Sequence, residues 1–362
     1  MDKPRVAIVL DYSLGLDQWR ERAAAGDALD ATPYGLDAAA DRFALVWARS
    51  HDETDLARRM RGRLARWLGC DVVHAWRNRR LIISADAVWT DTERQHLAVA
   101  LLQRLRPRSR RVPVVAQSVW LWDEWPAYGQ VRRAWVRWLL GAHAVEVCHS
   151  PGNVEASQRE VPGRRVRFLR FGTSIPPHGE RVDPVDVLSV GNDRCRDWQT
   201  LADALAQLPG VSARIVSSAP PARRVEWPDG VVVGAAPTRA DLAALYRGAR
   251  AIVVVSRANP YASGITAAIE ALDAGKPLVV TDTGGIGAYV EGAADLVPPG
   301  DSAALGAAIK DALDGGGVTP EPGARAERGL TARDYVDRYA GLTGQLLAGS
   351  RKTLRERIEG RH

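Results

Sequence analysis

The stretch Asn259–Asp282, NPYASGITAAIEALDAGKPLVVTD, predicts a loop, a helix and a buried strand in direct succession. Ser263 is a candidate N-cap, because its hydroxyl can accept a hydrogen bond from a first-turn N–H group. Apolar residues then recur at the spacing of one helical face: Ile265, Ile269 and Leu272. Gly275 and Pro277 end the helix, and residues 278–280 form an apolar run typical of a parallel sheet. A loop of small residues therefore leads into a helix beside a sheet.

The N-terminus of this helix is a predicted anion site. First-turn N–H groups and the positive end of the helix dipole can hold a phosphate without a charged side chain. Ser263, Gly264 and Ile265 would supply these donors. Glu270 lies beside Thr266 on the helix, away from the apolar face, so it can face a ligand held there. The alternative is a solvated glutamate on the helix surface.

A longer run, residues 264–292 followed by LVPPGD at 296–301, resembles the donor-binding segment of the retaining nucleotide-sugar glycosyltransferases of family 4, which have the GT-B fold. The resemblance implies that Glu270 holds the ribose hydroxyls of the nucleotide and that amides at the helix start hold the diphosphate. It places six more residues in the donor site: Asn259, Tyr261, Ser263, Gly264, Ile265 and Thr266. The family often has a second glutamate, which touches the sugar, where this sequence has Ala262.

A second part of the resemblance supplies positive charge. Residues 191–198, GNDRCRDW, follow a predicted strand and lead into a predicted helix. In the family, a glycine here is followed by an arginine and a lysine that neutralise the donor diphosphate. The resemblance implies donor-binding roles for four residues: Gly191, Asn192, Arg194 and Arg196. Arg196 is the favoured cation because it directly precedes Asp-Trp, and an exposed loop arginine is the alternative.

The composition is that of a two-domain globular protein. The 362 residues are 46% hydrophobic, which permits two cores. No run of 18 apolar residues occurs, and the chain enters a strand pattern at its start, so we expect a cytoplasmic protein, either free or peripheral on the inner membrane face. Three cysteines without metal-ligand spacing are predicted to be reduced core thiols: Cys70, Cys148 and Cys195.

Positive charge is concentrated in the first half of the chain. Residues 1–178 carry a net charge of +8, and residues 179–362 carry −2. This excess favours an anionic partner, such as a phospholipid surface or a lipid-phosphate acceptor. An arginine-rich chain from a GC-rich bacterial genome is the alternative. Nucleic acid is not expected, since no recognisable binding module accompanies the charge.

Strand and helix patterns alternate along the chain, which predicts an α/β protein of two Rossmann-like domains with parallel sheets facing a central cleft. In the first half the predicted strands are Arg5–Tyr12, Phe43–Trp47, Val72–Ala75, Ala87–Thr90, Val112–Ser118, Ala144–His149 and Val166–Phe171. No G-x-G-x-x-G follows the first strand, so a nicotinamide enzyme is not expected.

We place the acceptor-side domain at residues 1–175 and the donor-binding domain at residues 176–330. Residues 331–350 are a predicted terminal helix that, as in the GT-B proteins, crosses back to the first domain. Residues 358–362 resemble a protease site running into a histidine tag and are left out of the fold.

Acceptor-side candidates come from the first domain. Loops at the carboxyl ends of strands bind ligands in open sheets, so the first strand contributes Asp11 and Tyr12. His74 stands in residues 71–75, DVVHA, which resemble a strand end of the family; a hydrogen-bonded core histidine is the alternative. The run SVWLWDEW would either bind an acceptor or pack between domains, and contributes Trp120, Trp122 and Asp123.

Residues 130–140, QVRRAWVRWLL, place Val131, Trp135 and Trp138 on one helical face with arginines at its flanks. This pattern is typical of an interfacial helix on an anionic membrane, with aromatic rings at headgroup depth. A core helix with solvated arginines is the alternative.

The resemblance implies a retaining glycosyltransferase that moves a hexose from a UDP- or GDP-linked donor to a glycan, lipid-linked or small-molecule acceptor. No catalytic dyad is expected, because the leaving phosphate can take the acceptor proton while the protein supplies position and charge. No metal or other cofactor is expected, since Arg196 and the helix dipole can neutralise the diphosphate. The alternatives are a GT-B sugar-nucleotide epimerase and a degenerate GT-B protein that binds nucleotide or a partner without turnover.

Overall fold

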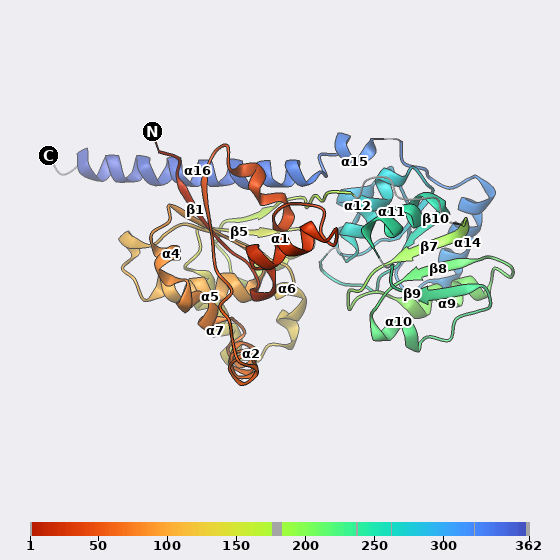
Figure 1. Ribbon diagram of the computed structural model, residues 1–362, viewed down its shortest axis with the longest axis horizontal. Coiled ribbons are helices and arrows are strands. Elements are labelled where there is room, and N and C mark those ends of the chain that lie inside the picture. Colours follow the sequence, from red (N-terminus) through yellow and green to blue (C-terminus); the bar gives the residue numbers. More distant parts are fainter. Residues whose placement is uncertain (1, 176–182, 237, 262, 322, 360–362) are drawn as a thin grey trace.

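The computed structural model describes residues 2–175, 183–236, 238–261, 263–321 and 323–359, with the backbone alone from residue 350. Two six-stranded sheets lie side by side, each in its own domain with flanking helices (Figure 1). All pairs of neighbouring strands are parallel. Parallel strands need crossover connections, which the intervening helices provide. The predicted fold class, two Rossmann-like domains, is confirmed.

The first sheet has the strand order β2-β1-β3-β4-β5-β6. Its strands are β1 (Arg5–Val9), β2 (Ala44–Trp47), β3 (Ala87–Thr90), β4 (Val114–Ser118), β5 (Val145–Cys148) and β6 (Val166–Phe168). Its helices are α1 (Leu16–Ala24), α2 (Asp55–Leu68), α3 (Val72–Arg77), α4 (Arg79–Ile83), α5 (Glu93–Arg104), α6 (Leu121–Glu124), α7 (Gln130–Leu140) and α8 (Pro151–Glu160). Short 3-10 turns are η1 (Tyr12–Leu14), η2 (Pro33–Ala39), η3 (Arg108–Arg110) and η4 (Trp125–Ala127).

The second sheet has the order β12-β11-β10-β7-β8-β9. Its strands are β7 (Val185–Val190), β8 (Ala213–Val216), β9 (Val231–Gly234), β10 (Ala249–Val254), β11 (Leu278–Thr281) and β12 (Asp295–Val297). Its helices are α9 (Trp198–Ala206), α10 (Pro220–Arg224), α11 (Arg239–Gly248), α12 (Ile265–Ala274), α13 (Gly287–Val290), α14 (Ser302–Asp314) and α15 (Ala324–Glu327). Our domain boundary borders residues 176–182, which, like Ala262 and residues 360–362, lie outside the described residues.

The last helix, α16 (Ala332–Glu359), runs along the first domain (Figure 1). Tyr335 and Tyr339 both donate their hydroxyls to Gln117 Oε1, at 2.7 and 2.5 Å. Trp89 Nε1 donates to Thr343 Oγ1 at 2.7 Å. These buried hydrogen bonds fix α16 to β3 and β4. The chain therefore connects the two domains twice, once before the second domain and once after it.

The predicted strand Val72–Ala75 is wrong, because these residues begin α3. Asp71 is the N-cap, and its Oδ1 accepts a hydrogen bond from the His74 N–H at 3.1 Å. A short apolar run fits a strand or a buried helical turn equally well, and the capping carboxylate decides for the helix here. The strand β12 was not predicted.

The predicted N-cap of α12 is also wrong. Gly264 holds that position with a φ of 84°, a conformation that favours glycine. The Ser263 hydroxyl instead donates to Asp193 Oδ2 at 2.5 Å, and its N–H donates to the Tyr261 carbonyl. Ser263 therefore joins the loop before α12 to the loop after β7 and offers no backbone donor to a ligand.

Candidate functional site

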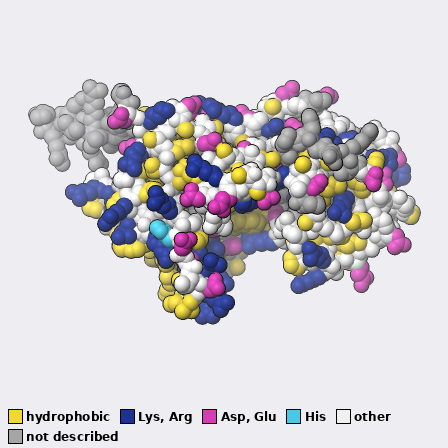
Figure 2. Space-filling view, in the orientation of Figure 1, with side chains coloured by type: hydrophobic (Ala, Val, Ile, Leu, Met, Phe, Trp, Pro, Cys, Tyr) yellow, Lys and Arg dark blue, Asp and Glu magenta, His cyan; other side chains and the backbone are white. Residues whose placement is uncertain are grey.

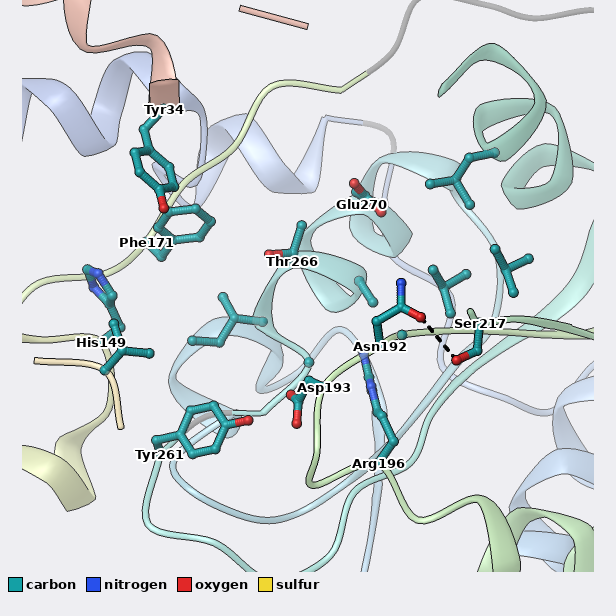
Figure 3. A pocket seen from close by; sticks show the side chains of 18 of the residues that line it. Tyr34, His149, Phe171, Asn192, Asp193, Arg196, Ser217, Tyr261, Thr266 and Glu270 are labelled. Carbon is teal, nitrogen blue, oxygen red and sulfur yellow. Dashed lines mark hydrogen bonds between the residues drawn. The ribbon is translucent and has the colours of Figure 1, made fainter. Parts of the chain in front are cut away.

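A cavity of about 850 Å³ lies between the two domains, at the carboxyl ends of both sheets (Figure 3). Its first-domain wall includes residues that directly follow β3, β4 and β5, and its second-domain wall includes residues that follow β7 and precede α12. Ligands of open parallel sheets bind at this end of the strands. The cavity is therefore the candidate active site.

Arg196 provides buried positive charge on the second-domain wall. The residue is 4% exposed, and its guanidinium has room because two neighbours lack a side chain. A Cβ atom at Gly191 would lie 2.1 Å from Arg196 Nε, and one at Gly264 would lie 2.7 Å from Nη1. Neither nitrogen has a hydrogen-bond partner among the described residues. Burial lowers the pKa of Arg196, because desolvation disfavours the charged form. A buried cation with unused donors is suited to bind an anion.

The N-terminus of α12 lies beside this guanidinium. Gly264, Ile265 and Thr266 line the cavity, so the first turn of the helix forms part of its wall. Helices leave their first N–H groups unpaired and carry a positive dipole end there. The helix start and Arg196 thus converge on one place that favours a phosphate or diphosphate.

Glu270 reaches the same cavity from the second turn of α12 (Figure 3). The residue is 5% exposed, so the alternative of a solvated surface glutamate is wrong. Burial raises the pKa of Glu270, while its hydrogen bond with Tyr246 and the charge of Arg239 oppose that shift. Arg239 Nη1 stands 3.6 Å from the Glu270 carboxylate. The glutamate is therefore held in position and keeps acceptor capacity toward the cavity.

Two more of the predicted donor-side residues line the cavity. Asn192 Oδ1 accepts hydrogen bonds from Ser217 Oγ at 3.1 Å and from Ser218 N at 2.7 Å, which orders the loop after β8 (Figure 3). The Tyr261 hydroxyl points toward Asp193. These contacts shape the wall around Arg196.

Arg194 and Asn259 are outside the cavity lining. The Arg194 guanidinium crosses to the first domain, where it pairs with Asp123 Oδ2 at 2.6 Å and Glu124 Oε1 at 3.1 Å. Asn259 holds the loop before α12 by donating its N–H to Thr283 Oγ1 at 2.9 Å. Both residues join structural segments, and of the two candidate arginines Arg196 alone reaches the cavity.

Among the predicted acceptor-side residues, Trp120 lines the cavity, where its ring lies 4.3 Å from that of Tyr261 between centroids. His74 and Trp122 do not line the cavity, so they are wrong as acceptor contacts; each is 2% exposed within the first-domain core. The Trp122 Nε1 donates to the buried Glu146 carboxylate at 2.9 Å. An apolar or aromatic residue in a loop-like run can belong to the core, and these two do.

Three further acceptor-side candidates lie near the cavity without lining it. Asp123 is engaged by Arg194. Asp11 lies behind the wall, and its N–H donates to Asp91 Oδ2 at 3.1 Å. The Tyr12 ring packs edge-on against His74, 5.4 Å between centroids. Asp11 and Tyr12 therefore lie outside the cavity lining, and the segment between β1 and β2 reaches the cavity through Arg22, Asp27 and Tyr34 instead.

Three residues that sequence reasoning missed give the first-domain wall its chemistry. Asp91 follows β3 and is 3% exposed, His149 follows β5, and Asn153 belongs to α8. Among the described residues, Asp91 Oδ1, His149 Nε2 and Asn153 Oδ1 have no hydrogen-bond partner. All three residues line the cavity. The signal for Asp91 was its place directly after the predicted strand 87–90.

His149 Nε2 and Asn153 Oδ1 are hydrogen-bond acceptors, and Asp91 Oδ1 is an acceptor when the carboxyl is ionised. Burial raises the pKa of Asp91 to about 7. His149 Nδ1 lies 2.7 Å from the Leu169 carbonyl, so it carries the ring proton and leaves a lone pair on Nε2. Burial lowers the pKa of His149 to about 4, which keeps that tautomer neutral at pH 7. Asn153 Nδ2 donates to the Val119 carbonyl, which leaves its oxygen free. The first-domain wall therefore suits a ligand that donates hydroxyl hydrogens.

Comparison with known proteins identifies the fold. Residues 185–315 match the sequence model of a family described as glycosyl transferases group 1. A sucrose-phosphate synthase from Thermosynechococcus elongatus resembles the chain at 18% identity with a TM-score of 0.64, over 99% of this chain and 100% of that one. The fold is that of the GT-B glycosyltransferases.

Other GT-B structures match over nearly the whole chain. An α,α-trehalose-phosphate synthase (UDP-forming) from Burkholderia vietnamiensis has 13% identity and a TM-score of 0.61, with 94% of this chain and 96% of that one covered. Anabaena HepE in complex with UDP and glucose has 16% identity and a TM-score of 0.52, with 96% and 99% covered. At these identities the likeness is one of fold. Among curated proteins, none matches the sequence significantly.

Proposed function

We propose that the protein is a retaining glycosyltransferase that moves a hexose from a UDP- or GDP-linked donor to a hydroxylated acceptor. The observation that carries the proposal is a buried cation beside a helix N-terminus on one wall of the cavity, with unpaired acceptor atoms on the facing wall. The second-domain wall offers hydrogen-bond donors and positive charge, from Arg196 and the start of α12. The first-domain wall offers acceptors, from Asp91, His149 and Asn153. A nucleoside diphosphate fits the former, and a sugar or polyol fits the latter.

In the proposed reaction, a bond forms between an acceptor hydroxyl oxygen and the anomeric carbon as the bond from that carbon to the diphosphate oxygen breaks. The hydroxyl proton passes to the departing phosphate oxygen on the same face, which retains configuration. Arg196 and the α12 N–H groups stabilise the negative charge that grows on the diphosphate. This arrangement supports a reaction without a metal ion, since the protein itself supplies the positive charge.

Two structural relatives support a UDP-linked sugar as the donor, because HepE is in complex with UDP and glucose and the trehalose-phosphate synthase is UDP-forming. Titration calorimetry of the protein with UDP, GDP, ADP and TDP tests the donor assignment. We expect UDP or GDP to bind in the micromolar range and the matching nucleotide sugar to be consumed when a sugar or glycan acceptor is added. Binding without consumption for any acceptor would favour the degenerate, nucleotide-binding alternative.

One observation favours the epimerase alternative. Asp91 and His149 place a carboxyl group and an imidazole, which can act as acid and base, in the cavity. An epimerase would convert the nucleotide sugar without an acceptor. Incubation of UDP-N-acetylglucosamine with the protein alone separates the two functions. Appearance of an epimer would support epimerisation, whereas transfer that depends on an acceptor supports the glycosyltransferase.

Asp91 is expected to make stability depend on pH. Its folded pKa of about 7 exceeds the ordinary aspartate value of 3.8, so between about pH 4 and pH 7 the folded protein holds a proton that the unfolded chain has lost. Stability from this group therefore falls as pH rises through that window, by up to about 1.4 kcal/mol per pH unit. Urea unfolding at pH 5 and pH 7 should show a larger loss for the wild type than for Asp91→Asn. Equal losses would contradict the buried, protonated carboxyl.

A further inference from the structure

The most apolar face of α2 is turned toward solvent. Four large hydrophobic residues form a stripe along it: Leu56 is 69% exposed, Met60 62%, Leu64 37% and Trp67 79%. Successive members are three or four residues apart, which places them on one helical face. An amphipathic helix in a globular protein normally turns such a face to the core. This stripe, about 16 Å long at 1.5 Å per residue, is left uncovered.

A row of arginines runs beside the stripe. Arg59, Arg63 and Arg66 project from the adjacent face of α2, all three are exposed, and none makes an ion pair with the described residues. Figure 2 shows hydrophobic and basic side chains together over α2, at the lower tip of the molecule. Hydrophobic and basic surface therefore lie next to each other on one protruding element.

The inner face of α2 is held in a way that fixes this orientation. Arg61 points inward and pairs with Glu53 at 3.0 Å and with Asp71. The small Ala65 is buried on the same side. Gly69 ends the helix in a left-handed conformation. A buried ionic anchor and a small residue thus occupy the position that the apolar stripe would take if it belonged to the core.

We propose that α2 is a membrane-docking helix, whose stripe inserts among the acyl chains of an anionic bilayer while its arginines bind lipid phosphates. This pairing of an apolar face with a cationic flank is what an interfacial helix requires. An anionic surface complements the charge, whereas a second copy of the chain would bring like charges together. Within the described residues, no helix is long and apolar enough to cross a membrane, so docking would be peripheral. The proposal stands apart from the donor assignment.

The sequence pattern had pointed to α7 as the interfacial helix, and the structure gives it a smaller exposed face. Val136, Leu139 and Leu140 of α7 are buried in the core. Trp138 is 44% exposed and stacks on Trp135, with Arg104 over its ring. The two helices are neighbours, because Arg132 of α7 reaches the Gly69 end of α2. Contact of α7 with the bilayer would follow docking of α2.

Sedimentation with lipid vesicles tests the proposal. The wild type should bind vesicles made of equal parts phosphatidylglycerol and phosphatidylcholine, should bind pure phosphatidylcholine at least tenfold more weakly, and should be released by salt. Leu56→Ser with Met60→Ser and Trp67→Ser should lower binding at least tenfold. Arg59→Gln with Arg63→Gln and Arg66→Gln should lower it about 100-fold, at roughly fivefold per arginine.

Matched controls lie on the second domain, where Val232 is 54% exposed on β9 and Arg223 and Arg224 are exposed on α10. Val232→Ser, and Arg223→Gln with Arg224→Gln, should leave vesicle binding unchanged. Melting temperature and nucleotide affinity should be unchanged in all these variants, which separates loss of docking from loss of fold or donor site. Equal binding to neutral vesicles, or none to either kind, would overturn the proposal. So would a dimer that the stripe variant dissociates, or loss of binding in Trp135→Ala with Trp138→Ala alone.

Discussion

Arg196→Ala is expected to reduce kcat by about 100- to 1000-fold, the range found when one preorganised donor to a developing anion is removed. The guanidinium is buried, and its Nε and Nη1 have no partner among the described residues, so the ligand-free protein holds a charge that only an anion can satisfy. Negative charge on the diphosphate grows as the bond to the sugar breaks. The loss should therefore be larger in kcat than in donor affinity, and steady-state kinetics with the preferred donor measures both.

Two companion variants make this result specific. Gly191→Ala leaves the arginine in the chain but places a Cβ atom 2.1 Å from its Nε, so the guanidinium must move and kcat should also fall. Arg194→Ala removes an exposed arginine whose partners are Asp123 and Glu124, and should change kcat less than threefold. The melting temperature of ligand-free Arg196→Ala should stay near that of the wild type, because an unpaired buried charge does not stabilise the fold. If kcat fell for Arg194→Ala and not for Arg196→Ala, Arg194 would replace Arg196 as the proposed diphosphate contact.

Structural features that depend on neighbouring residues in the chain could be predicted from the sequence, whereas features that depend on contacts formed on folding could not. The strand Ala87–Thr90 was predicted with the bounds that the structure has, because a short β-rich apolar run between polar segments is a local signal. Residues 72–75 have the same apolar character, yet they begin a helix, whose N-cap Asp71 accepts a hydrogen bond from the His74 N–H. A capping contact of this kind is not recorded in the periodicity of apolar residues.

Most of the donor-side residues that the resemblance implies line the cavity, because they belong to the loop after β7 and to the start of α12, which lie together at the ends of neighbouring strands. The acceptor side depends on which side chains remain unpaired after folding. Asp91 and His149 follow different strands, and each is a candidate contact because one of its side-chain atoms has no hydrogen-bond partner within the described part of the chain. Trp122, which looked like a ligand contact, instead donates to the buried Glu146. Likewise α2 was passed over, because its periodicity is that of an ordinary core helix, and only the structure shows its apolar face outside.

Glu270→Ala is expected to weaken nucleotide binding about 100-fold. The carboxylate is 5% exposed and is held by Tyr246 and Arg239, so it meets a ribose already oriented. Two hydroxyls donating to one charged group account for about 3 kcal/mol, and the charge makes each bond stronger than a neutral one. Titration calorimetry with the free nucleoside diphosphate measures the loss without any turnover.

Glu270→Gln separates charge from shape at the same position. The amide keeps one acceptor oxygen, so its affinity should fall between the wild type and Glu270→Ala. Because burial raises the pKa of Glu270, the wild type should lose nucleotide affinity on acidification at a higher pH than an exposed glutamate would, and Glu270→Gln should lack that step. The proposed partner of Arg196 is the diphosphate and that of Glu270 is the ribose, so binding of a nucleoside, which has no phosphate, should distinguish the two residues. Glu270→Ala should weaken nucleoside binding as strongly as it weakens nucleotide binding, whereas Arg196→Ala should leave nucleoside binding unchanged; the reverse pattern would exchange the two assignments.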